Sequence, residues 1–66
     1  MGTRLKELRL ERNLRLKDVA QAIGLTLNAI SMYENGVREP SIETIKKLCL
    51  FYDVTSDYLI GLSDDY

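Results

Sequence analysis

Residues 24–36 read GLTLNAISMYENG, a short segment enclosed by two glycines. Thr26 is a favourable N-cap, because its hydroxyl can accept a hydrogen bond from a free N–H in the first turn of a helix. Gly36 can adopt the left-handed conformation with which helices commonly end. The segment therefore predicts a helix over roughly residues 27–35, flanked by two tight turns.

A second helix is predicted just before it, over roughly residues 16–23, and Gly24 would end it. Because only residues 24–26 then link the two helices, they must cross steeply and need a small side chain where they touch. A small residue, a turn glycine and inward apolar residues at this spacing form the packing pattern of a helix-turn-helix. Its packing positions are Ala20, Gly24, Leu25, Ile30 and Tyr33.

Three further helices are expected from capping residues and apolar spacing. One would cover roughly residues 3–12, one would begin after the N-cap Ser41, and a short one would begin after Thr55. Strand signals are weak throughout. The predicted fold class is all-α, with five short helices in a single domain, 1–66, that has its core in residues 3–62 and a frayed tail at 63–66. Inward positions on the outer helices include Leu5, Leu8, Ile42, Ile45, Leu48, Tyr52, Tyr58, Leu59 and Leu62.

The composition excludes several classes of protein. A chain of 66 residues has room for one small domain, and no apolar run reaches the ~20 residues that span a bilayer. With one cysteine and no histidine, neither an internal disulfide nor a set of metal ligands is available. We therefore expect a protein of the reducing cytoplasm, with no cofactor, no metal, no membrane partner and no small-molecule substrate.

Charge is unevenly distributed along the chain, although the formal net charge is only −1. The first 17 residues hold six basic and two acidic side chains, whereas residues 48–66 hold four aspartates and no base. A surface that approaches phosphates and an ordinary solvated helix face explain the basic segment equally well.

Two longer segments resemble a known family. ISMYENGVREPSIETIKKL (residues 30–48) and FYDVTSDYLIGL (residues 51–62) closely resemble small bacterial and phage regulators. With them, residues 4–62 resemble the five-helix Cro- and lambda-repressor-like helix-turn-helix family of the xenobiotic-response-element type. The resemblance implies a compact lambda-repressor-like domain that regulates transcription, binds double-stranded DNA through its third helix, and commonly acts as a dimer.

The resemblance also implies which residues face DNA. The base-reading positions of the family fall on Leu27, Asn28, Ser31 and Met32, and the loop after the third helix supplies backbone contacts from Asn35, Val37 and Arg38. The phosphate-contacting position at the start of the second helix falls on Leu16. Arg9 and Arg12 are further candidates to donate to phosphates or bases.

Several of these positions depart from the family pattern. Thr-Gln is common where this chain has Arg15-Leu16, and losing the threonine cap would cost roughly 1 kcal/mol. A basic or amide side chain is common at the positions of Leu27 and Val37. Aliphatic side chains also replace Glu or Lys at Leu10 and Leu50.

Two functions from different classes remain open at this point. The first is a sequence-specific DNA-binding transcriptional regulator. The second is a self-associating module, natural or redesigned, with weak or no DNA binding. Its homo-oligomeric interface would be formed by Leu10, Leu16, Leu27, Val37 and Leu50. An enzyme is not expected, because the sequence offers no histidine, no phosphate loop and no convergent carboxylate pair.

Overall fold

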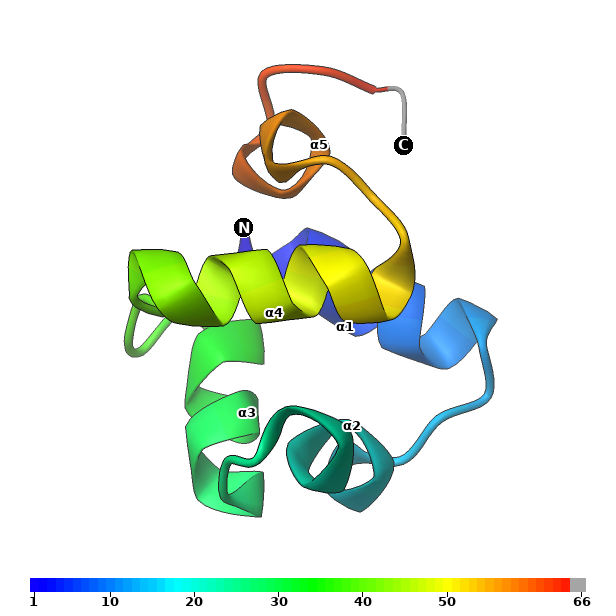
Figure 1. The fold of residues 1–66 in the computed structure, drawn as a ribbon, viewed down its shortest axis with the longest axis vertical. Helices are drawn as coiled ribbons and strands as arrows, with labels where there is room; N and C mark the ends of the chain where they lie inside the picture. Colours follow the sequence, from blue (N-terminus) through cyan, green and yellow to red (C-terminus); the bar gives the residue numbers. More distant parts are fainter. Residues whose placement is uncertain (65–66) are drawn as a thin grey trace.

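The computed structural model describes residues 1–64, which form five α-helices and no strand (Figure 1). None of these helices combines the length and the apolar character needed to cross a membrane. The helices are α1 (Gly2–Glu11), α2 (Leu16–Ile23), α3 (Leu27–Glu34), α4 (Ile42–Tyr52) and α5 (Ser56–Ile60).

Local capping explains where most of the helices begin. The side-chain oxygens of Thr26, Ser41 and Thr55 each accept a hydrogen bond from a backbone N–H three residues ahead, at 3.1, 3.3 and 3.1 Å. All three were predicted from the sequence. Left-handed residues end α2, α4 and α5, and Asn13 adopts a positive φ just beyond α1.

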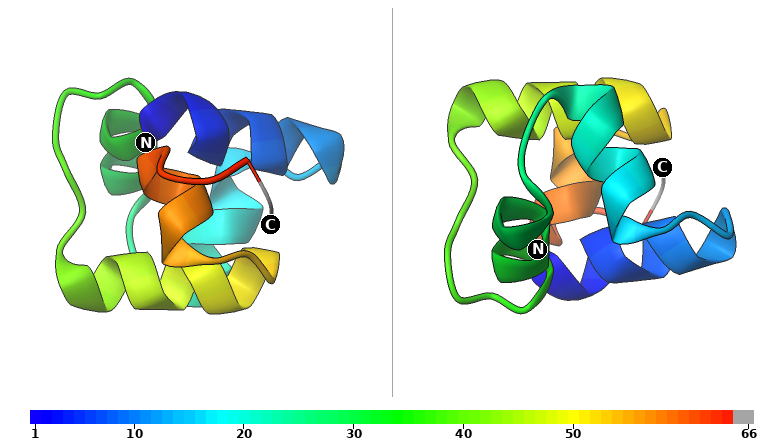
Figure 2. Two further views of the ribbon diagram at one scale, coloured as in Figure 1. Left: turned by 90° about the horizontal axis from the view of Figure 1, so that it is seen from above. Right: turned by 90° about the horizontal axis from the view of Figure 1, so that it is seen from below.

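The helix-turn-helix is formed by α2 and α3. The backbone N–H of Leu25 donates to the carbonyl of Ala20 at 2.9 Å, and Gly24 takes a φ of 75°, so the chain reverses within three residues. Figure 1 shows α2 nearly end-on while α3 runs vertically, and Figure 2 shows the same steep crossing from below. This confirms the geometry expected from the packing pattern.

The core lies between these two helices and the other three. Tyr52, Leu8, Leu48, Leu59 and Val19 are its largest fully buried side chains, and they come from four different helices. Burial of side chains from every helix is what a domain of this size needs, because the free energy of unfolding of so small a chain is only a few kcal/mol.

Two positions expected to face inward do not. Leu62 is 76% exposed, because α5 ends at the left-handed Gly61 and the helical spacing stops before Leu62. Ile42 is 73% exposed at the first position of α4. The expected tail begins at Ser63, whose carbonyl accepts a hydrogen bond from Arg4 at 2.8 Å, and residues 65 and 66 lie outside the described part of the chain.

Arginines of α1 connect this helix to the C-terminal half of the domain. Arg4 donates to the carbonyl of Tyr58 at 2.9 Å and lies 4.4 Å from the centre of its ring. Arg12 donates to the carbonyl of Tyr52 at 2.9 Å, at the end of α4. A cation at this end of a helix stabilises the partial negative charge of its last carbonyls. Much of the basic character of the N-terminal segment is therefore directed into the fold.

Candidate nucleic-acid interface

The outward face of α3 combines aliphatic and neutral polar side chains. Leu27 is 50% exposed, and Asn28 beside it is exposed in the same first turn. One turn later, Ser31 and Met32 are half-buried. Asn28 and Met32 lie opposite the buried Ile30, and Ser31 lies beside them. Leu27 precedes Ile30 by three residues and so lies at the edge of this side, where half of its surface is exposed at the start of the helix. All four side chains are therefore at least partly accessible, and Asn28, Ser31 and Met32 lie on one side of α3.

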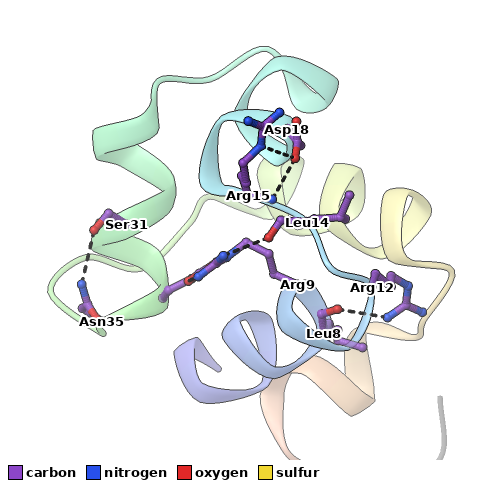
Figure 3. Close-up of polar contacts among 9 residues, drawn as sticks. Leu8, Arg9, Arg12, Leu14, Arg15, Asp18, Ser31 and Asn35 are labelled. Carbon is purple, nitrogen blue, oxygen red and sulfur yellow. Dashed lines mark hydrogen bonds and ion pairs between the residues drawn. The ribbon is translucent and has the colours of Figure 1, made fainter.

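The end of α3 and the following loop extend this surface. The side-chain amide of Asn35 donates to the hydroxyl oxygen of Ser31 at 3.3 Å, which joins two successive turns (Figure 3). Val37 and Arg38 follow in the loop, both exposed. In the described part of the chain, no hydrogen bond or ion pair involves the Arg38 guanidinium, so its donors point to solvent.

The start of α2 differs from expectation. Leu16 is half-buried and packs against the core, so only part of this side chain is accessible to a partner. Arg15 has no acceptor with which to cap the helix, but its backbone N–H donates to Asp18 Oδ2 at 2.8 Å (Figure 3). This hydrogen bond lowers the pKa of Asp18. Asp18, the third residue of α2, thus provides half of a capping box. This contact was not predicted from the sequence.

A buried ion pair lies directly behind α3. Arg9 of α1 donates two hydrogen bonds to the carboxylate of Glu34, the last residue of α3, at 2.8 and 3.0 Å. The two side chains are only 12% and 5% exposed. Arg9 also donates to the carbonyl of Leu14 at 3.1 Å, so one guanidinium joins α1, the end of α3 and the turn that leads to α2 (Figure 3).

The prediction that Arg9 contacts DNA is therefore wrong, because its donors are committed inside the fold. The hydrogen bond to Glu34 also raises the pKa of Arg9. One signal for the pair was present in the sequence: Glu34 follows Ile30 by four residues and so lies on the inward face of the same helix. Acidic residues are almost never fully buried unless they are paired, so such a glutamate indicates a cationic partner.

Close backbone packing adds to this contact between α1 and α3. A Cβ atom placed on Gly2 would lie 2.5 Å from the carbonyl oxygen of Glu34, so only glycine fits there. The N-terminus of α1 consequently lies against the C-terminal carbonyls of α3, where the partial charges of the two helix ends attract each other.

The five aliphatic residues proposed for a protein interface do not share one face. Leu27 begins α3 and Val37 lies in the loop after it; both are exposed, whereas Leu16 is half-buried. Leu10 and Leu50 are exposed near the C-terminal ends of α1 and α4, which lie away from α3 in both views of Figure 2.

Comparisons with known proteins agree with this geometry. Residues 5–59 match the family model described as helix-turn-helix. The N-terminal DNA-binding domain of SinR from Bacillus subtilis superimposes with a TM-score of 0.81 at 28% identity, covering 89% of this chain and 87% of that one.

Similar sequences include regulators of phage and bacteria. The cryptic phage CTXphi transcriptional repressor RstR of Vibrio cholerae is 37% identical over 96% of this chain and 57% of its own length. The regulator DdrOP3 of Deinococcus deserti is 46% identical over 89% of this chain and 46% of its own. The chain spans about half the length of the curated relatives it matches.

The chain therefore belongs to the helix-turn-helix family, and its fold is that of a DNA-binding domain of transcriptional regulators. This is a family of regulators of the Cro and lambda-repressor type rather than of enzymes.

Removing one partner of the Arg9–Glu34 pair should destabilise the domain strongly. We expect Glu34→Ala to remove most of the free energy of unfolding, so that much of the helical signal is lost before urea is added, because the substitution leaves a buried guanidinium without its carboxylate. The matched control is Arg15→Ala, which breaks the exposed contact with Asp18 and should leave the urea midpoint nearly unchanged, because water screens an exposed ion pair. Urea unfolding followed by circular dichroism measures both. Equal losses in the two variants would contradict the structural role of the buried pair.

Proposed function

We propose that the domain regulates transcription by inserting the first turn of α3 into the major groove of double-stranded DNA. The observation that carries this proposal is the accessible first turn of α3, with Leu27 and Asn28 exposed, on a helix that crosses α2 steeply (Figure 1). In helix-turn-helix proteins, the N-terminal residues of the second helix contact base edges, while the first helix crosses the backbone. A regulator of this kind must share a compartment with the DNA that it binds. The cytoplasmic location expected from the sequence meets this requirement.

Phosphate contacts in this proposal come from few side chains. Arg38 lies exposed in the loop after α3, and the exposed Lys17 lies in the first turn of α2. Arg4 and Arg9 each pair with a carboxylate, Asp64 and Glu34, so they add little to the electrostatic attraction. The donors of Arg12 are directed to carbonyl oxygens, one of them that of Tyr52. We therefore propose modest non-specific affinity and binding as a homodimer, in which two copies of α3 reach half-sites one helical turn apart.

Salt dependence of DNA binding tests this proposal. Arg38→Ala should weaken binding to all duplexes by a similar factor and reduce the slope of log affinity against log salt by ~1, because one phosphate contact is lost. The control is Lys46→Ala, which removes the same charge from the side of α4 that faces α5. Fluorescence anisotropy with a labelled duplex from low to moderate salt measures the slopes. Absence of binding by the unaltered protein at low salt would refute DNA binding.

Self-association through α3 is the second candidate function. It is supported by the exposed aliphatic side chains of Leu27 and Val37, since burying a leucine contributes ~1.5–3 kcal/mol and a two-fold axis counts each residue twice. The partner would be a second copy of this chain. Because Leu27 would then be covered, self-association of this kind and DNA binding would compete.

Solution mass distinguishes this competing interface from a dimer that leaves α3 free. If copies associate through α3, Leu27→Gln should shift the light-scattering mass at micromolar concentration towards the monomer. Leu50→Gln, which alters an equally aliphatic but distant surface, should leave the mass unchanged. A monomer at all concentrations, or a dimer unaffected by Leu27→Gln, would rule out association through this face.

A further inference from the structure

The first turn of α3 has an unusual set of outward side chains for reading DNA. Leu27 and Asn28 are its exposed residues, and the helix as a whole, LNAISMYE, holds no lysine or arginine. The commonest specific contact to guanine is a bidentate one from arginine or lysine to O6 and N7. α3 cannot make that contact, so its chemistry favours other bases.

Asn28 is the residue of α3 best suited to a bidentate base contact. An asparagine amide donates to N7 of adenine and accepts from its N6 amino group, and adenine presents this acceptor–donor pair in the major groove. The other asparagine beside this surface, Asn35, already donates to Ser31 near the end of α3. Among the described residues, the Asn28 amide makes no hydrogen bond. It lies in the first turn of α3, the part of the helix that would enter the major groove.

Leu27 offers an apolar contact rather than a hydrogen bond. Half of its surface faces solvent, and its methyl groups have no polar atom that could bind a base edge. Thymine is the one base of DNA that presents a methyl group in the major groove. Covering that methyl group with Leu27 would remove apolar surface of both molecules from water.

We infer that α3 reads adenine–thymine pairs: Asn28 binds adenine through N7 and N6, and Leu27 covers the C5-methyl group of thymine in the same or a neighbouring pair. This inference rests on the proposed function, because it specifies the base class read by that surface. Leu27 would then be a specificity-determining residue, although a leucine replaces the basic or amide side chain that is usual at this position.

Base analogues that delete single groups test each contact. A duplex enriched from a random library by the unaltered protein supplies the operator, in which each dT is replaced in turn by deoxyuridine and each dA by 7-deazaadenine. We expect one deoxyuridine to weaken binding about four-fold, the loss for one buried methyl-sized group. One 7-deazaadenine should weaken it about ten-fold, because it removes the N7 acceptor and leaves the Asn28 amide N–H unsatisfied while the bond from the N6 amino group remains.

Protein variants assign each loss to a side chain. In Leu27→Ala the deoxyuridine penalty should disappear while the 7-deazaadenine penalty remains, and Asn28→Ala should show the reverse pattern. Leu62→Ala, which alters an exposed leucine after α5, is the control and should keep both penalties. Circular dichroism confirms that each variant is folded.

The outcomes separate this inference from the function on which it rests. An enriched operator whose penalties persist in Leu27→Ala and Asn28→Ala, or whose critical positions are guanine–cytosine pairs, would overturn adenine–thymine reading and leave DNA binding intact. Failure to enrich any sequence or to bind any duplex would overturn the proposed function, and this inference with it.

Discussion

The rest of the structure depends on the buried contact between Arg9 and Glu34. Two hydrogen bonds of 2.8 and 3.0 Å fix the end of α3 to α1, and a third, to the carbonyl of Leu14, fixes the turn before α2. Both charges have left water, which costs several kcal/mol per ion unless the partner is present in good geometry. The pair therefore favours one arrangement of α1, α2 and α3. Apolar packing alone would tolerate small shifts of these helices relative to one another.

Three arginines in or next to α1 help to build the fold. Arg4 and Arg9 of α1, and Arg12 directly after it, connect this helix to α5, α3 and α4 respectively. The outward side of α3 itself is uncharged, and the exposed cations nearby are Arg38 in the following loop and Lys17 in the first turn of α2. A recognition surface of this type gains little from attraction to phosphates, so its discrimination must come from hydrogen bonds and apolar contacts to base edges.

Features governed by nearby residues were predictable from the sequence. Thr26, Ser41 and Thr55 cap their helices because a cap needs only residues within one turn. The spacing from Ile30 to Glu34 indicates an inward glutamate, but its partner was not predicted, since Arg9 lies 25 residues away in the chain. Apolar spacing predicted that Leu62 lies in the core, but this holds only if the helix continues through Leu62. The left-handed Gly61 ends α5 before that residue. The face of α3 was predicted through family resemblance and periodicity together, but the partner that covers it depends on contacts that a single chain does not contain.

Contact between the outward first turn of α3 and DNA can be observed directly in backbone amide chemical shifts, recorded as duplex of the enriched sequence is added to the isotope-labelled protein. We expect the largest changes at Leu27, Asn28 and Ser31, smaller ones at Arg38 and the start of α2, and almost none near Leu50 and Leu62. Changes confined to α4 and α5, with α3 unaffected at saturation, would show that DNA binds elsewhere on the domain.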